Sequence, residues 1–253
     1  MNTLKNMKLN LLSSLVLCSI TFLASAQQPS DKIKTNTGPL TISPVQHASL
    51  VITWNNKTIY VDPTGTAATY KNFKAPDLIL ITDIHPDHLD PKIIDTLNTS
   101  KALFIVPQAV ADLLPGVEAE KITVLNNGNE ATKLDIKITA IPMYNIPETP
   151  DSRHPKGRGN GYILNIGGKN IYISGDTGDT KEMRALKNID VAFVCMNLPY
   201  TMDINHAASG VLAFKPAIIY PYHHKGQDIK AFKKLVNDKN PKIEVRLRNW
   251  YPN

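Results

Sequence analysis

The sequence predicts a single α/β domain in which two β-sheets pack face to face, with helices on their outer sides. The chain has 253 residues, of which 42% are hydrophobic and 20% charged, and this is enough for one domain with a sizeable core. Two stretches rich in short strand patterns are each followed by alternating strands and helices, without an internal linker. Two sheets that pack face to face, with helices on their outer sides, bury the apolar faces of such strands and helices.

The first half begins with three short strands, LTISPV, SLVITW and TIYVDP. The pair Asn55-Asn56 between the last two predicts a tight hairpin turn. The apolar run DLILIT predicts a buried strand that ends in a polar loop. Asp90 followed by Pro91 predicts the start of a helix over KIIDTL, and ALFIVP is the strand that follows.

The second half repeats this order. The strands KITVL, LDIKITAIP, GYILNI and KNIYIS are separated by turns such as NNGN and GGK. Helix EMRALKN, strand DVAFVC, helix NHAASGVLAF, strand AIIYP, helix IKAFKKLV and strand IEVRL then complete the chain. Cys195 ends an apolar strand, which predicts a buried thiol, and His206 is expected on the surface of a helix.

The N-terminus is typical of a secretory signal peptide, since Lys5 and Lys8 precede the apolar run LNLLSSLVLCSITFLASA. The pattern Ala24-Ser25-Ala26 predicts cleavage after Ala26; an uncleaved anchor and lipidation at Cys18 are the alternatives. Residues 27–37 are polar and predict a flexible leader before a domain over residues 38–253. We therefore expect an exported protein, periplasmic or secreted, without a membrane span after cleavage.

The composition argues against several classes of function. Two cysteines provide neither a disulfide framework nor a Cys-rich zinc module. The formal net charge is +6, but the Lys-rich stretch KAFKKLVNDKNPK favours a solvated helix face over a nucleic-acid site. We expect a small-molecule substrate and no nucleic-acid partner, and the sequence leaves the oligomeric state open.

Potential metal ligands are concentrated in the segment TDIHPDHLD. Four of them follow the DLILIT strand within six residues: Asp83, His85, Asp87 and His88. Three more lie at the borders of other strands: His154, Asp176 and His223. Carboxylate and neutral imidazole are donors that zinc and similar divalent ions accept, and strand ends meet at one sheet edge. The segment predicts a site for one or two divalent ions, and a polar turn that caps the next helix is the alternative.

The order of QHASLVI, TIYVDP, ILITDIHPDH, YISGDTGD and IIYPYHH resembles the metallo-β-lactamase superfamily. The most similar branch contains ascorbate-6-phosphate lactonase-like and N-acylphosphatidylethanolamine phospholipase D-like hydrolases, whose G-H-A-S or G-H-A-T element is matched here by residues 46–49 at three of four positions. DIHPDH fits the signature H-x-H-x-D-H except that Asp83 replaces the first His. The resemblance implies a four-layer αββα sandwich of two mixed sheets flanked by helices, with a metal site between the edges of the two sheets. It also implies that the protein is a hydrolase.

The resemblance also implies which residues share a metal. Asp83 and His85 would join His154 at one ion, Asp87 and His88 would join His223 at the other, and Asp176 would bridge the two ions. Tyr144 is the alternative to His154, because the third His of the family commonly follows the strand that here runs into Tyr144. Zn²⁺ is the expected ion; the harder Asp83 ligand makes Mn²⁺, Fe²⁺ or a single ion the alternatives.

Other side chains are expected to support the site or to bind substrate. Asp62 resembles the family's early Asp, which supports the metal loop by hydrogen bonds. Asp87 is the candidate to orient the attacking water and move a proton. Candidates for contacts with substrate, or else for ordinary packing and solvation, are His47, Tyr200, His224, Lys156 and Arg158, with Arg153 beside them; the cations would suit an anionic substrate.

Three functions fit these residues. The first is an exported metal-dependent hydrolase in which a metal-activated water attacks an ester, lactone or phosphodiester bond, because a divalent ion lowers the pKa of bound water from about 15.7 toward 7. The second is a β-lactamase. The third is a non-catalytic member whose degenerate site binds a ligand or ion. This third function is retained because Asp83 departs from the signature. We expect the first.

Overall fold

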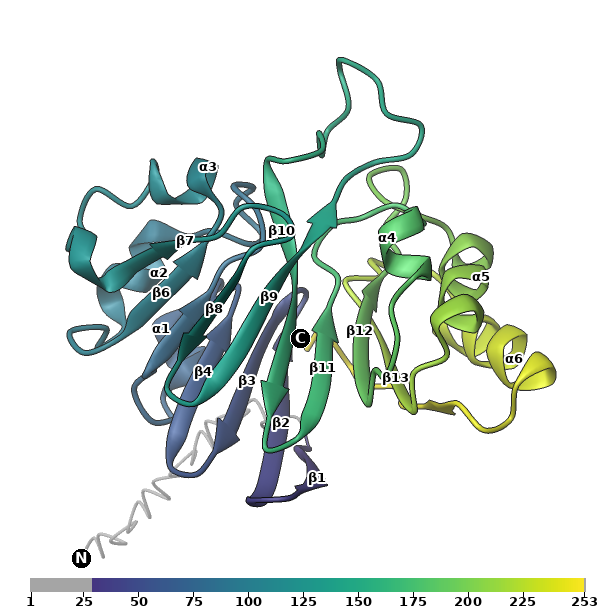
Figure 1. The fold of residues 1–253 in the computed structure, drawn as a ribbon, viewed down its shortest axis with the longest axis horizontal. Helices are drawn as coiled ribbons and strands as arrows, with labels where there is room; N and C mark the ends of the chain where they lie inside the picture. Colours follow the sequence, from purple (N-terminus) through teal and green to yellow (C-terminus); the bar gives the residue numbers. More distant parts are fainter. Residues whose placement is uncertain (1–28, 253) are drawn as a thin grey trace, which may run out of the picture.

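The computed structural model describes residues 29–252, so the predicted signal peptide lies outside the described residues. They form two seven-stranded sheets (Figure 1), and each sheet keeps its strands in chain order. The first sheet contains β1 (Asp31–Thr35), β2 (Gly38–Gln46), β3 (Ser49–Trp54), β4 (Lys57–Val61), β5 (Leu78–Leu80), β6 (Leu103–Val106) and β7 (Ile122–Val124). The second contains β8 (Glu130–Lys133), β9 (Ile136–Met143), β10 (Gly159–Ile166), β11 (Lys169–Ile173), β12 (Val191–Cys195), β13 (Ile218–Tyr222) and β14 (Glu244–Val245).

Both sheets are mixed, as the resemblance implies. In the first sheet β1 to β4 are antiparallel and β4 to β7 parallel. The second sheet repeats the pattern, with β8 to β11 antiparallel and β11 to β14 parallel. Parallel neighbours need crossover connections, and these carry most of the helices and site loops.

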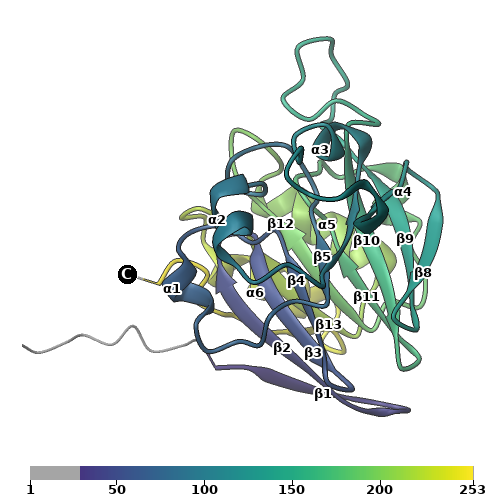
Figure 2. The same cartoon turned by 90° about the vertical axis from the view of Figure 1, so that its left-hand side faces the viewer.

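Helices cover the outer face of each sheet. The first sheet carries α1 (Ala67–Tyr70), α2 (Pro91–Thr96) and α3 (Gln108–Ala111), with the short 3₁₀ helix η1 (Ala119–Lys121) before β7. The second carries α4 (Lys181–Arg184), α5 (Ile204–Phe214) and α6 (Ile229–Lys239). Viewed from the side of α1, α2 and α3, these helices lie in front of the strands, and α5 and α6 lie behind them (Figure 2). The predicted four-layer αββα sandwich is therefore confirmed.

Apolar side chains on both faces of the strands form the core. Along β3, Leu50 and Ile52 join the large cluster that fills the space between the sheets, whereas Val51 joins the cluster beneath α1, α2 and α3. This alternation follows from the period of two along a strand. Cys195 is buried in the large cluster, as predicted, and so adds no reactive thiol to the surface.

Two local predictions are confirmed by backbone geometry. Asn55 and Asn56 both have positive φ, 46° and 60°, in the turn between β3 and β4, as a tight hairpin requires. Asp90 caps α2, because its side chain accepts hydrogen bonds from the backbone N–H groups of Lys92 and Ile93 at 3.1 and 3.3 Å.

The prediction of a flexible leader over residues 27–37 is wrong for Asp31–Thr35, which form β1 and pair with β2. Ile33 and Thr35 are buried and Lys32 and Lys34 are exposed, so this polar stretch has the alternation of an edge strand. The elements β8, α1 and α3 were not predicted from the sequence either. The last predicted strand, IEVRL, is only Glu244–Val245.

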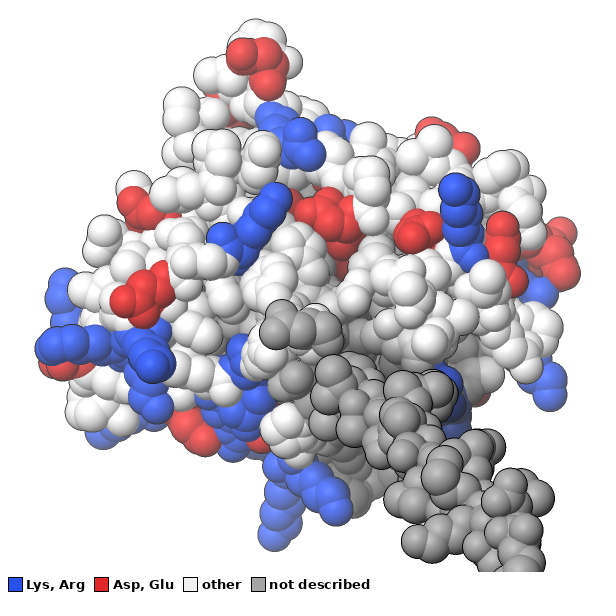
Figure 3. Space-filling view, turned by 180° about the vertical axis from the view of Figure 1, so that it is seen from behind, with Lys and Arg blue, Asp and Glu red and all other residues white. Residues whose placement is uncertain are grey.

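The positive net charge does not form a single stripe on the face shown in Figure 3. Lys and Arg side chains there are interspersed with Asp and Glu, and acidic side chains lie in a hollow near the middle of the face. Within residues 29–252, no helix has both the length and the hydropathy that a membrane crossing needs.

Candidate metal centre

The predicted ligands come from four loops that meet at one edge of the two sheets. Residues 81–90 follow β5, Asp176 follows β11, and His223 follows β13. His154 lies in the long connection between β9 and β10, which extends beyond the sheets at the top of Figure 1. Each loop begins at a buried strand, so the scaffold fixes where its side chains start.

Asp62 holds the loop that carries the DIHPDH motif. Its Oδ1 accepts a hydrogen bond from the Thr82 backbone N–H at 2.7 Å, and its Oδ2 lies 2.7 Å from the Thr82 hydroxyl and 2.8 Å from Nδ1 of His88. Asp62 and His88 are fully buried. A carboxylate on Nδ1 leaves Nε2 of His88 free to bind a metal, so Asp62 has the supporting role that the sequence predicts.

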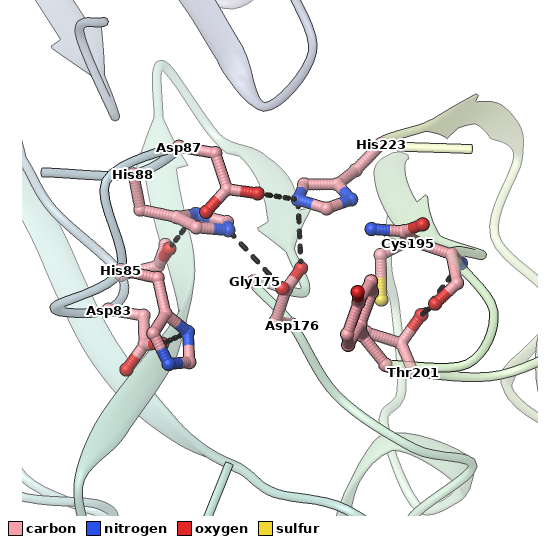
Figure 4. A network of polar contacts seen from close by, with 12 residues as sticks. Asp83, His85, Asp87, His88, Gly175, Asp176, Cys195, Thr201 and His223 are labelled. Carbon is pink, nitrogen blue, oxygen red and sulfur yellow. Dashed lines mark hydrogen bonds and ion pairs between the residues drawn. The ribbon is translucent and has the colours of Figure 1, made fainter. Parts of the chain in front are cut away.

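Asp176 lies at the centre of the site. Its Oδ2 is 3.2 Å from Nε2 of His154 and 3.4 Å from Nε2 of His88, and its Oδ1 is 3.3 Å from Nε2 of His223. Figure 4 shows the Asp176 carboxylate between His88 and His223. One carboxylate therefore reaches imidazoles from both predicted halves of the centre, which is the arrangement expected of a bridging ligand.

The position before Asp176 requires glycine, because its φ is positive and a Cβ there would clash with neighbouring side chains. Gly175 has a φ of +60°, and a Cβ at this position would lie 2.3 Å from Sδ of Met143 and 3.1 Å from Cβ of Thr82. Its N–H donates to the Tyr222 hydroxyl at 3.0 Å. A side chain here would push β11 away from the loop that carries His88.

The second group consists of Asp83, His85 and His154. Oδ2 of Asp83 lies 2.6 Å from Nδ1 of His85 and 3.8 Å from Nε2 of His154. Asn145 and His154 are joined by two hydrogen bonds: the Asn145 N–H donates to the His154 carbonyl at 2.9 Å, and the His154 N–H donates to Oδ1 of Asn145 at 2.8 Å. The residues between them therefore loop out and return, and His154 lies close to the end of β9.

The donor atoms fit a divalent ion because many of them are buried and lack another partner. No hydrogen bond is made by these buried side-chain atoms: Nε2 of His88, Oδ1 of Asp176 and both ring nitrogens of His154 and His223. An unsatisfied buried polar atom costs about 1–3 kcal/mol, and coordination of an ion removes that cost. Among the described residues three groups of three lie close enough to share an ion: Asp83–His85–His154, His88–Asp176–His223 and His47–Asp87–His223.

Asp87 lies at the solvent side of the group formed by His88, Asp176 and His223. Its Oδ2 is 3.3 Å from Nε2 of His223 and 3.0 Å from Nε2 of His47, and 41% of its side chain is exposed. It groups with His223 and His47 rather than directly with His88. Burial raises the pKa of Asp87, but the neighbouring His223 and His47 outweigh this and lower it, so the carboxylate stays ionised.

The charges of the site balance one another. Burial raises the pKa of Asp176, but the neighbouring His223, His88 and His154 outweigh it and hold the pKa well below the ordinary range. Burial lowers the pKa of His88, but Asp176 and Asp62 raise it well above its ordinary value. The buried carboxylates therefore favour positive charge among the imidazoles, and a divalent cation supplies such charge without protonating a ligand.

A small cavity of about 100 Å³ opens onto the carboxylates of Asp87 and Asp176. It is lined by Asp87, Arg153, Asp176, Asn197, Tyr200 and Lys225. The Arg153 guanidinium lies 4.7 Å from the centre of the Tyr200 ring, and Lys225 Nζ lies 5.8 Å from it. The cavity thus combines the proposed metal ligands on one side with two cations around an aromatic ring on the other.

Several predicted residues have other contacts. Tyr144 is buried and donates its hydroxyl hydrogen bond to Glu182 at 2.8 Å, so His154 rather than Tyr144 reaches the centre. Lys156 pairs with the same Glu182 at 3.1 Å, and Arg158 binds Asp83; neither cation lines the cavity. The predicted role of Lys156 and Arg158 in binding substrate is therefore not supported, and only Arg153 of the three lines the cavity.

The remaining candidates are placed as follows. His47 contacts Asp87 through a ring nitrogen, and Tyr200 lines the cavity. His224 packs against Tyr251, with ring centres 4.9 Å apart, and His206 lies exposed on α5. Three contributors to the site were not predicted from the sequence: Asn197, Lys225 and Tyr251. Only Lys225 had a signal, since it follows His223 by two residues.

The chain is similar to known proteins in sequence and in fold. Residues 41–223 match the family model described as "Beta-lactamase superfamily domain". A UPF0173 metal-dependent hydrolase of Pyrococcus abyssi is 32% identical over 211 residues, which cover 76% of this chain and 90% of that protein. A crystal structure from Parabacteroides distasonis, assigned as a metal-dependent hydrolase, is 41% identical with a TM-score of 0.81, over 88% of this chain and 100% of that one. Igni18, a metallo hydrolase from Ignicoccus hospitalis, is 24% identical with a TM-score of 0.69 over 85% and 96% of the two chains, and shows the shared fold.

Proposed function

Because the chain belongs to the beta-lactamase superfamily domain family and to the UPF0173 metal-dependent hydrolases, we propose that it hydrolyses an ester, lactone or phosphodiester bond in a small anionic molecule outside the cytoplasm. That it is a metal-dependent hydrolase of this superfamily follows from these relatives. The bond, the anionic character of the substrate, the identity of the metal and export are the proposed parts.

The cavity beside Asp87 and Asp176 is the observation that carries the proposal. Arg153 and Lys225 line it. Among the described residues, neither cation has a carboxylate oxygen within 4.0 Å. Cations that face a reaction centre bind and orient an anionic group of a substrate. A phosphodiester carries such a charge itself, and an ester or lactone would carry it as a neighbouring carboxylate or phosphate. The resemblance to lactonase-like and phospholipase D-like hydrolases supports the same bond classes.

The residues divide the chemistry among them. A bound divalent ion, for which we propose Zn²⁺ with Mn²⁺ or Fe²⁺ as alternatives, would supply a low-pKa water and stabilise developing negative charge. Asp87 is ionised and partly exposed, so it would accept a hydrogen bond from the attacking water, orient it, and pass its proton to the leaving group. His88, His223 and Asp176 would hold the ion, and Asp62 orients His88.

Export is proposed from the N-terminal sequence. Residues 1–26 have the basic start, apolar run and Ala-Ser-Ala pattern of a cleaved signal peptide. Expression of the full chain in a bacterium with an outer membrane should yield a periplasmic protein that begins at Gln27 by N-terminal sequencing. Protein that keeps residues 1–26 and stays in the cytoplasm would count against export without affecting the proposed reaction.

The reaction is tested with a panel of chromogenic substrates on the metal-loaded protein. The panel contains nitrophenyl esters, lactones and bis-nitrophenyl phosphate, with and without an added carboxylate, and a chromogenic cephalosporin. We expect turnover of at least one ester, lactone or phosphodiester, loss of that turnover in Asp87→Asn, and no loss in the control His206→Gln, which is exposed on α5. Turnover of the cephalosporin alone would favour a β-lactamase. Bound metal without turnover of any substrate would favour a non-catalytic binding protein.

A further inference from the structure

The Asp83 carboxylate, which stands where the superfamily signature has a His, is already bound by a cation of this chain. Nε of Arg158 donates to Oδ1 of Asp83 at 3.1 Å, and Nη2 donates to Oδ2 at 2.9 Å. Asp83 is fully buried, and 21% of the Arg158 side chain is exposed. Two parallel hydrogen bonds between guanidinium and carboxylate are the strong, geometrically specific form of this pair.

The backbone fixes Arg158 in this position. Arg158 precedes β10, and the N–H of Asn160 donates to the carbonyl of Thr82 at 2.9 Å, next to Asp83. At Gly159 a Cβ would lie 2.8 Å from that same carbonyl oxygen. The close approach of β10 to the loop therefore places the guanidinium on Asp83 and keeps it there.

The two halves of the centre consequently carry different charges. The half around His88, Asp176 and His223 has the Asp176 carboxylate with Asp87 beside it, and within residues 29–252 no Lys or Arg nitrogen lies within 4.0 Å of either. The half around Asp83, His85 and His154 has Asp83, which Arg158 neutralises, and shares Oδ2 of Asp176, which lies 3.2 Å from Nε2 of His154. The first half thus has two carboxylates without a Lys or Arg partner and the second half only the shared one, so the first half attracts a divalent cation more strongly.

We propose that the two halves bind divalent ions with unequal affinity, the half with Asp176, His88 and His223 tightly and the half with Asp83 weakly, and that Arg158 sets the difference. The Arg158 guanidinium holds the oxygen that would otherwise ligate the second ion, and its charge repels that ion. This inference rests on the proposed function only in assuming that the centre binds a metal. Arg158 is a positioning residue in this sense, because it acts through Asp83.

The experiment is a Zn²⁺ titration of the metal-stripped protein, followed by calorimetry and by elemental analysis after dialysis. We expect one tightly bound ion per chain and a second that binds at least about tenfold more weakly. In Arg158→Met the second ion should bind at least about tenfold more tightly than in the wild type, while the first is unchanged. The opposite role, in which Arg158 supports a ligating Asp83 from outside, predicts a loss of about 10–100-fold in the same variant.

Arg248→Met is the matched control. Arg248 forms a similar two-bond pair with Asp31, has the same 21% side-chain exposure as Arg158, and binds the carboxylate of an edge strand rather than a proposed ligand. It should leave both affinities unchanged. If Arg158→Met does not fold, Asp83→Asn tests the same point: the first ion should bind within about twofold of the wild type, and loss of that ion would overturn the proposal.

Two equally tight ions in the wild type, no tightly bound ion, or weaker binding of the second ion in Arg158→Met would each overturn the inference. The readout needs no substrate. A protein that binds one tight and one weak ion but hydrolyses no member of the substrate panel would leave the inference standing while the proposed function fails.

Discussion

Nε2 of His47 lies 3.0 Å from Oδ2 of Asp87, which joins the turn between β2 and β3 to the DIHPDH loop. Because an ionised carboxylate only accepts hydrogen bonds, Nε2 must carry the proton. Nδ1 of His47 then accepts from the Tyr251 hydroxyl, 2.9 Å away, whose oxygen in turn accepts the Lys225 N–H. His47 thus holds the same Asp87 oxygen that His223 contacts, and its ring lies beside that of His223, with ring centres 3.8 Å apart.

This contact predicts that His47→Gln slows the reaction without releasing metal. Asp87 would lose a partner that orients it, so kcat should fall by about 10–100-fold while KM changes little. Steady-state kinetics on the best panel substrate and elemental analysis measure the two effects. His206→Gln should change neither, and unchanged kcat in His47→Gln would remove His47 from the mechanism.

The Asp62 network predicts a loss of both stability and metal affinity in Asp62→Ala. The change leaves the Thr82 N–H, the Thr82 hydroxyl and His88 Nδ1 without their buried acceptor. We expect the free energy of unfolding to fall by about 3–5 kcal/mol and metal affinity by about 10–100-fold. Urea denaturation and zinc titration measure these, with Asp135→Ala as the control, because Asp135 is an exposed partner of Lys57. A change below about 1 kcal/mol would show that Asp62 is not a structural acceptor.

The cavity predicts that Arg153→Ala and Lys225→Ala raise KM for anionic substrates more than for neutral analogues. Each variant removes a cation from the cavity wall and leaves the proposed ligands in place. An increase of about 5–20-fold in KM, with kcat within about threefold, corresponds to loss of one charge-assisted contact. Lys156→Ala is the control from the same loop as Arg153, because Lys156 pairs with Glu182 instead. Equal effects on charged and neutral substrates would rule out an anion subsite.

The cap of α5 predicts a pH-dependent contribution to stability. The Asp203 side chain accepts the His206 backbone N–H at 2.8 Å, and this bond lowers the pKa of Asp203. A lowered folded-state pKa contributes stability that is present above the ordinary carboxyl pKa of about 3.9 and is lost as the pH falls through the lower folded value.

Asp203→Ala should therefore reduce the free energy of unfolding by about 1 kcal/mol near pH 7 and by less near pH 3. Denaturant titrations at the two pH values make the comparison. Asp203→Asn, which keeps the capping oxygen without the charge, should retain most of the stability and lose the pH dependence. A loss from Asp203→Ala that is the same at both pH values would contradict a role for the ionised carboxylate.

The sequence was sufficient where function depends on local pattern. The cap at Asp90, the hairpin at Asn55-Asn56 and the candidate ligands of the DIHPDH loop all depend on residues close together in the chain. The structure has the cap and the hairpin, and it brings the candidate ligands into groups that could hold an ion. Asp62 could also be predicted, because it ends a recognisable strand and its family counterpart has a fixed role.

Contacts between distant segments could not be predicted in this way. The Arg158–Asp83 pair depends on how closely β10 approaches the loop after β5, and no spacing in the sequence encodes that distance. The return of His154 to the end of β9 depends on its two hydrogen bonds with Asn145. The strand β1 was missed because a polar edge strand resembles a polar linker in composition.

Anomalous diffraction from a crystal of the zinc-loaded protein tests the central claim most directly. The strongest peak should lie about 2.0–2.2 Å from Nε2 of His88, Nε2 of His223 and an Asp176 oxygen. Zinc bound only at another part of the surface, with these three side chains making no common contact to it, would contradict a catalytic metal centre at this edge of the sheets.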